Sequence, residues 1–73
     1  MLEHLLYTMR LDAGLSVLNV SHALHVSTAV VYQWERGASR PRYAHLAALM
    51  QLYEASPAAR DDVAHLAAFG ERR

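Results

Sequence analysis

The stretch SVLNVSHALHVSTAVVYQWERG, residues 16–37, predicts two short helices joined by a tight turn. Ser16 and Ser27 are suitable N-caps, because a serine hydroxyl accepts a hydrogen bond from a free amide of the first helical turn. The first helix is expected over about residues 17–23, and the second ends at Gly37, which tolerates a left-handed backbone. About four residues separate the two helices, which is the spacing of a helix-turn-helix.

The second of these helices, over residues 28–36, has two chemically different faces when its residues are placed about 100° apart. Val30, Val31 and Trp34 point one way and form the expected core face. The opposite face is small or hydrogen-bonding and ends in a cation; it consists of Thr28, Ala29, Tyr32, Gln33 and Arg36. Such a face suits entry into a DNA major groove, which is about 12 Å wide.

Helical spacing recurs on both sides of this segment, and no stretch alternates with a period of two. The apolar stripes are Leu2, Leu5, Leu6 and Met9 before it, and Leu46, Leu49, Met50 and Tyr53 after it. Gly14 is expected to end the first helix, Pro41 to open the fourth, and Ser56-Pro57 to cap and open the fifth. The chain therefore predicts five short helices and no sheet.

A chain of 73 residues, 53% of them hydrophobic, is long enough for one small domain. It has no cysteine, which excludes disulfides and cysteine-based zinc sites and makes the cytoplasm the expected location. No stretch approaches the ~20 apolar residues of a membrane span, and the N-terminus does not resemble a signal peptide. We expect a single all-α domain over residues 1–73, a compact five-helix bundle with the helix-turn-helix at about 16–36 and the last helix at about 58–69.

The charges balance, but they are unevenly distributed. Seven basic residues, all of them Arg, oppose seven acidic ones, so the formal net charge is zero. Between residues 13 and 45, Arg36, Arg40 and Arg42 oppose only Glu35, a local surplus of +2. The arginine fork suits bidentate contacts with phosphate. This distribution is compatible with a nucleic-acid partner.

The same segment resembles the lambda-repressor/Cro-like (XRE) helix-turn-helix family. The residues that carry the resemblance are Gly14-Leu15-Ser16, Ala23-Leu24-His25-Val26-Ser27, Val31, Trp34-Glu35-Arg36-Gly37 and Pro41. The match is ungapped from Gly14 to Gly37 and covers roughly residues 5–55. The resemblance implies a bundle of four or five helices whose third helix contacts double-stranded DNA in the major groove.

The resemblance also implies roles for individual residues. The expected base contacts are Thr28, Ala29, Tyr32 and Gln33, and the expected phosphate contacts are Arg36, Arg40, Arg42 and, through its backbone amide, Val17. In the family, an arginine late in the first helix pairs with the glutamate of the Trp-Glu-Arg-Gly motif. Arg10 and Glu35 occupy those positions here, so we expect a structural ion pair between them.

Four positions depart from the family pattern. His25 replaces the usual turn glycine, so the turn must adopt an unusual backbone conformation or lengthen. Ser21 replaces an alanine inside the second helix, and its hydroxyl is expected to bond back to the i−4 carbonyl. Val17 and Leu18 stand where polar residues are usual, and together they predict an exposed apolar spot.

The last helix has a broad apolar face formed by Val63, Leu66 and Phe69. One helix packed on a small core does not need so broad a face. We expect part of it, with Leu52 or Tyr53, to form the two-fold contact of a homodimer. Such a dimer would place two helices on a pseudo-palindromic operator.

One alternative function stays open at this point, a protein-interaction module on a helix-turn-helix scaffold with weak DNA affinity, either antitoxin-like or a phage-type partner-binding protein. The neutral net charge and the predicted apolar spot motivate it. An enzyme is not expected, because five short helices leave little room for a cleft. His22 and His25 have the spacing of a ligand pair but no third ligand nearby, so neither a metal nor a cofactor is expected.

Overall fold

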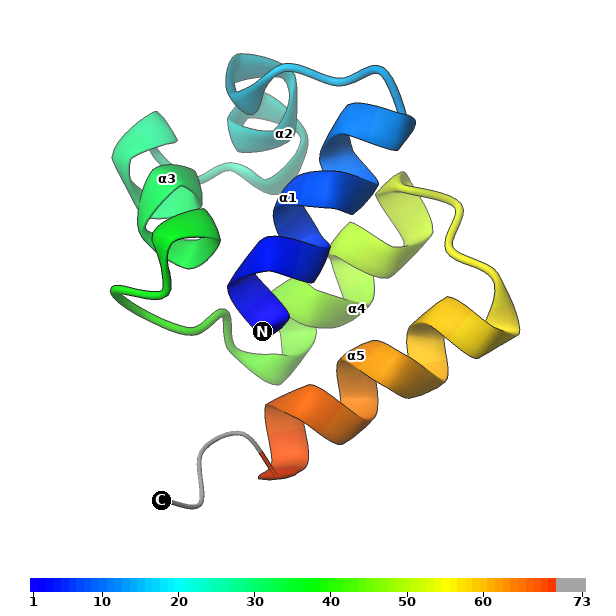
Figure 1. The fold of residues 1–73 in the computed structure, drawn as a ribbon. Coiled ribbons are helices and arrows are strands. Elements are labelled where there is room, and N and C mark those ends of the chain that lie inside the picture. The colour runs from blue at the N-terminus through cyan, green and yellow to red at the C-terminus, as the bar shows by residue number, and fades with distance from the viewer. Residues whose placement is uncertain (70–73) are drawn as a thin grey trace.

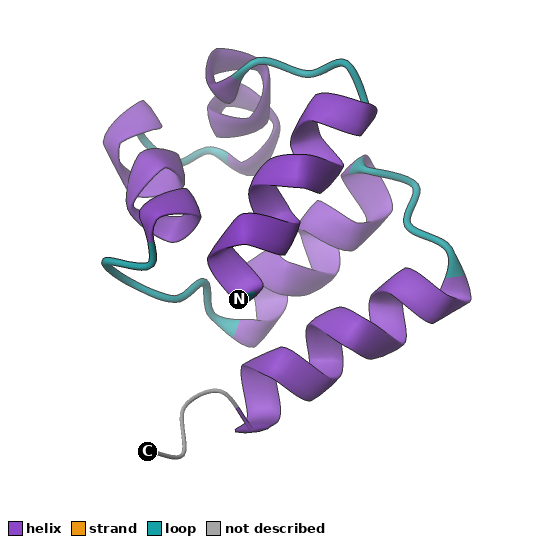
Figure 2. Cartoon of the chain, viewed as in Figure 1, coloured by secondary structure: helices purple, strands orange, loops and turns teal. Residues whose placement is uncertain are grey.

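The computed structural model describes residues 1–69, in which five helices and no strand are present (Figures 1 and 2). The helices are α1 (Leu2–Asp12), α2 (Val17–Leu24), α3 (Thr28–Arg36), α4 (Tyr43–Leu52) and α5 (Pro57–Phe69). The Cα radius of gyration is 11.1 Å, close to the value of about 11 Å for a compact chain of this length. The all-α five-helix prediction is confirmed. None of the helices in this part of the chain has the length and apolar character needed to cross a membrane.

A single core holds the helices together. α3 packs against α1 and α2, α4 packs against α2, and α5 packs against α1. The fully buried side chains Leu6, Val20, Val31 and Leu49 come one each from α1 to α4. α5 adds Val63, and in Figure 1 it lies on the side of α1 away from α3. The first four helices therefore make the center of the fold, and α5 covers one side of it.

The turn between α2 and α3 is closed by its backbone. His25 has φ 58° and ψ 43°, in the left-handed region. This conformation lets the Val26 amide donate to the Ser21 carbonyl at 3.0 Å, while the Ser27 hydroxyl accepts from the first turn of α3. Of the two outcomes expected at His25, the structure shows the unusual backbone conformation. The turn therefore fixes the angle between α2 and α3.

Side-chain caps also define the starts of α2 and α5. The Ser16 hydroxyl accepts from the Asn19 amide at 3.0 Å, and the Asn19 side chain accepts from the Ser16 amide at 3.0 Å. This reciprocal capping box satisfies two amides at once. Ser56 caps α5 through the Ala59 amide, as its position before Pro57 predicts. The expected Ser caps of α2, α3 and α5 are therefore confirmed.

Two local expectations were wrong. Pro41 does not open α4, because it is buried ahead of the helix and Arg42, in an extended conformation, is the N-cap. The Ser21 hydroxyl donates to the Leu18 carbonyl, three residues back, and not to the i−4 carbonyl.

Several residues expected at the surface are buried in the core. Val17 is 7% exposed, so the predicted apolar spot on α2 is reduced to Leu18. Val63 and Tyr53 are 3% and 8% exposed, so little of either side chain is at the surface, and the dimer contact expected of them stays a prediction. The other residues named for that contact are Leu52 and Leu66, which are partly buried against the same core, and Phe69, whose side chain lies outside the described residues.

We predict that His25→Gly raises the free energy of unfolding by up to about 1 kcal/mol, because glycine relieves the steric cost of a left-handed backbone. The matched control is His22→Gly, which places the same substitution inside α2 and is expected to lower stability by about 1 kcal/mol. Urea unfolding followed by circular dichroism measures both. A loss at position 25 as large as that at position 22 would contradict the role assigned to the turn.

Candidate nucleic-acid interface

The inner face of α3 is fixed in the core. Val31 and Trp34 are 1% and 5% exposed, and Val30 packs against the same cluster. The Trp34 ring lies 5.3 Å, centroid to centroid, from the His45 ring of α4. The core face predicted for this helix is therefore confirmed, and its orientation is set by large side chains that have no room to rotate.

The opposite side of α3 is open to solvent. All five residues predicted there, Thr28, Ala29, Tyr32, Gln33 and Arg36, are exposed. We call this set the outward face of α3. It combines an amide, a phenol, a hydroxyl, a methyl group and a terminal cation over two turns of helix. These groups can form hydrogen bonds and apolar contacts with the edges of base pairs.

The loop after α3 presents two more cations. Arg40 and Arg42 are exposed, as is Arg36 at the end of the helix. The amides of Ala38 and Ser39 donate to the Gln33 carbonyl at 3.0 and 3.4 Å, so the start of the loop is folded back onto the helix. Arg36 at the end of the outward face and Arg40 and Arg42 in the loop after it are therefore three exposed cations close together in the sequence, as expected for phosphate contacts.

The start of α1 lies close to this loop, where the Glu3 side chain approaches Gly37. Gly37 has φ 78°, and a Cβ added to it would lie 3.1 Å from Cδ of Glu3. The pKa of Glu3 is lowered mainly by its hydrogen bond with the Met1 amine, and to a smaller extent by the charge of Arg40. Arg40 is thus close to an acidic side chain. In the sequence, Arg36 precedes it and Arg42 follows it.

The Arg10–Glu35 ion pair expected from the sequence forms in the structure. Nε of Arg10 donates to Oε2 of Glu35 at 2.8 Å, and Nη2 donates to Oε1 at 3.0 Å. Nη1 of Arg10 donates to the Leu15 carbonyl at 3.0 Å, and the guanidinium carbon lies 5.5 Å from the centroid of the Tyr7 ring. The two side chains are 10% and 7% exposed.

This pair has a structural and an electrostatic consequence. It joins α1 to α3 and to the loop before α2, and the hydrogen bond to Glu35 raises the pKa of Arg10. Both carboxylate oxygens of Glu35 are occupied, although Glu35 directly precedes Arg36 in α3. The negative charge beside the outward face is therefore neutralised inside the protein and does not oppose an anionic partner.

The start of α2 offers only backbone to a partner at position 17. The Val17 side chain is buried, so the helix N-terminus is the part that remains for the phosphate contact expected there. Amides in the first turn of a helix lack partners within the helix and favour anions. The Val17 side chain is therefore part of the core, and its backbone amide is the group expected at the edge of the candidate interface.

One prominent surface residue was missed from the sequence. Tyr43 is 85% exposed, more than any other large hydrophobic residue in the described part of the chain. It directly follows Arg42 and stands three residues before Leu46, so helical spacing places it on the apolar side of α4. The sequence pattern therefore gave no signal that its side chain is exposed.

Residues 4–63 match the family described as the helix-turn-helix domain. The match covers α1 to α4 and the first half of α5, so the chain belongs to this family. The family is a DNA-binding, non-enzymatic kind of fold, which supports DNA as the partner of this protein. No curated protein and no solved structure matches the chain.

We predict that Arg10→Met lowers the free energy of unfolding by about 3 kcal/mol, because it leaves the Glu35 carboxylate buried without its partner. The double variant Arg10→Met with Glu35→Leu removes both charges and is expected to recover much of that loss. Urea unfolding of the two variants and the parent checks this. Equal stability of the single variant and the parent would refute a structural role for the pair.

We predict that stability declines between pH 10 and 12 through Tyr53. Burial, together with the nearby charge of Glu35, raises the pKa of Tyr53 from its ordinary value of 10.0 to about 12. Its contribution is therefore complete below pH 10 and is lost as the pH rises towards 12, because the unfolded chain ionises first. Thermal melts of Tyr53→Phe should show a smaller alkaline decline than the parent, and Tyr32→Phe is the exposed control. Identical declines in parent and Tyr53→Phe would contradict the prediction.

Proposed function

We propose that this protein is a sequence-specific regulator of transcription that binds double-stranded DNA in the cytoplasm. It acts as a repressor-like homodimer of the lambda-repressor/Cro-like (XRE) kind on a pseudo-palindromic operator. One observation carries the proposal. Every residue of the outward face of α3 is exposed, while Val31 and Trp34 on the reverse side are fixed in the core.

Sequence would be recognised by the outward face inserted into the major groove. The Gln33 amide can pair bidentately with adenine, and Ala29 or the Thr28 methyl can contact the methyl group of thymine. Tyr32 lies beside them and would contact a base or a sugar. A single good contact of this kind discriminates between base pairs by ~1–3 kcal/mol.

Phosphate contacts would set the position of the helix on the duplex. Arg36 and Arg42 extend from the end of α3 and the start of α4, Arg40 lies between them, and the Val17 amide opens α2. Such contacts carry no sequence information but fix register and orientation. Binding should weaken as salt rises, because each neutralised phosphate releases counterions.

The protein-interaction alternative loses part of its support. It was motivated by the neutral net charge and by an apolar spot of Val17 and Leu18, but Val17 is in the core. Leu18, 53% exposed, is left as a single apolar side chain on α2, and single apolar residues are normal on a protein surface. DNA binding is therefore the function that the site favours.

Selection of bound duplexes from a random DNA pool tests the proposal directly. The expected result is an enriched sequence with two related half-sites, whose centers are ~34–36 Å apart or a multiple of that. Recovery of a pool no different in sequence from the input would overturn sequence-specific binding.

We predict that Gln33→Ala weakens binding to the selected site by ~1–3 kcal/mol and relaxes the preference at one base pair. Arg42→Ala should instead weaken binding to selected and random duplexes alike. Gln51→Ala is the matched control, since Gln51 is an exposed glutamine on α4, away from the outward face. Fluorescence anisotropy with both duplexes measures the effects. If Gln33→Ala lost equal affinity for both duplexes, the role assigned to Gln33 would be wrong.

A further inference from the structure

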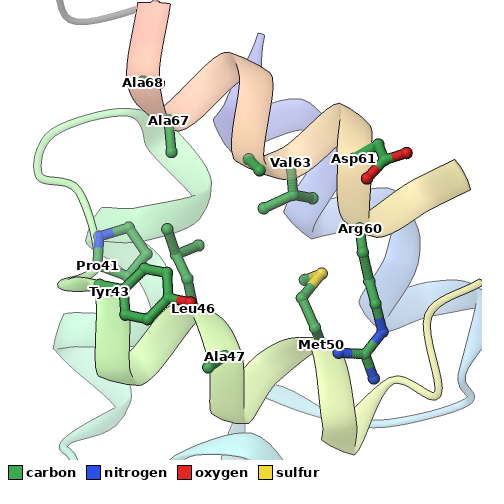
Figure 3. A pocket seen from close by; sticks show the side chains of 11 residues that line it. Pro41, Tyr43, Leu46, Ala47, Met50, Arg60, Asp61, Val63, Ala67 and Ala68 are labelled. Carbon is green, nitrogen blue, oxygen red and sulfur yellow. The ribbon is translucent and has the colours of Figure 1, made fainter. Parts of the chain in front are cut away.

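An open groove of about 590 Å³ lies between α4 and α5 (Figure 3). α5 packs against α1, and the walls that face the groove are lined with alanine. The principal lining residues are Leu46, Ala47 and Met50 on α4 and Val63, Ala64 and Ala67 on α5. The short alanine side chains leave the space between the two helices unfilled. The groove is therefore a mostly apolar surface that residues 1–69 leave uncovered.

The two ends of the groove differ in chemistry. Tyr43 and Pro41 lie at one end, and Arg60 and Asp61 lie at the other, beyond Met50 (Figure 3). Tyr43 is 85% exposed, so most of its ring is uncovered by the described part of the chain. Arg60 is anchored by a 3.2 Å hydrogen bond from Nε to the Ala55 carbonyl in the loop between α4 and α5. One end thus presents an uncovered aromatic ring, and the other presents a positioned cation beside a thioether and a carboxylate.

We propose that a second copy of this chain occupies the groove, with Tyr43 of each copy placed at the Arg60 end of the other. A two-fold axis through the middle of the groove makes the two grooves antiparallel, so a residue at one end meets the opposite end of its partner. The match at that end is chemical. A guanidinium attracts the face of an aromatic ring, a methionine sulfur packs well against one, and a carboxylate accepts the phenol hydrogen.

The charges at the groove favour a second copy over a strongly charged partner. Arg60 and Asp61 contribute one charge of each sign, and the whole chain has zero formal net charge. The charges of the lining residues therefore give a polyanion such as DNA no net attraction within the groove, and the exposed Arg40 and Arg42 lie on either side of Pro41, outside the lining. The groove therefore complements its own opposite end better than it complements DNA.

The inference rests on the proposed homodimer and specifies its interface. Tyr53 does not line the groove and Val63 is only 3% exposed in its wall, so the contact centres on the groove and on Tyr43. The groove is lined by the loop before α4, by α4 and by α5, so a second copy there leaves the outward face of α3 open. Pro41 belongs to the groove wall and lies between Arg40 and Arg42. Pairing through the groove would therefore steady the loop that carries two of the proposed phosphate contacts.

Sedimentation equilibrium without DNA, from low to high micromolar protein, tests the interface. The parent is expected to dimerise, and Ala47→Arg, which fills the groove with a charged side chain, should raise the dimer dissociation constant by at least about tenfold. The matched control is Ala44→Arg, because Ala44 is equally an exposed alanine of α4 but does not line the groove. Tyr43→Ala should also raise the constant, while Leu11→Ala, at a residue 50% exposed on α1, should not.

Thermal melts of each variant show that it is folded, and these substitutions fall at exposed positions. A monomeric parent at every concentration would overturn the proposal, and so would a dimer that Ala47→Arg leaves intact or that Ala44→Arg weakens equally. Binding of a single half-site duplex is measured separately and should be unchanged in Ala47→Arg. Failure of all DNA binding by the parent would refute the proposed function while leaving the self-association result to stand on its own.

Discussion

The position of the outward face of α3 depends on the buried ion pair between Arg10 and Glu35. A helix of nine residues is not stable in isolation, so its orientation comes from its tertiary contacts. Trp34 and Val31 supply the apolar part of those contacts, but apolar packing is not directional. The two hydrogen bonds of the arginine fork are directional, and the third hydrogen bond of Arg10, to Leu15, ties the loop before α2 to the same point.

The same pair holds the negative charge of Glu35 inside the fold and leaves the positive charge of Arg36 at the surface, which suits an anionic partner. Glu35 is the acidic residue nearest in sequence to the outward face, and its carboxylate is turned inward and fully engaged. Arg36, the next residue, is exposed. A chain with no net charge can therefore present a local excess of positive charge, because part of its negative charge is paired inside the fold. For a partner as strongly anionic as DNA, this local distribution matters more than the net charge.

Local features of this fold could be predicted from sequence, whereas contacts between distant segments could not, except for the Arg10–Glu35 pair that the family resemblance implied. Ser16, Ser27 and the two faces of α3 follow from capping chemistry and helical geometry, and the strained His25 follows from a histidine placed where a glycine is usual. The burial of Val17 and Val63 could not be predicted, because periodicity defines a stripe but not the element that covers it. The α4–α5 groove was missed for the same reason, since it is a space left by alanines, and periodicity does not show how closely two consecutive helices pack.

The central claim is that the outward face of α3 contacts the bases of double-stranded DNA. The most direct test is an NMR titration of isotopically labelled protein with a selected duplex, followed through the backbone amides. The largest shift changes should fall at Thr28, Ala29, Tyr32 and Gln33, with smaller changes at Arg36 and Arg42. Changes concentrated on α5 and the α4–α5 groove, with α3 unaffected at saturation, would contradict the account.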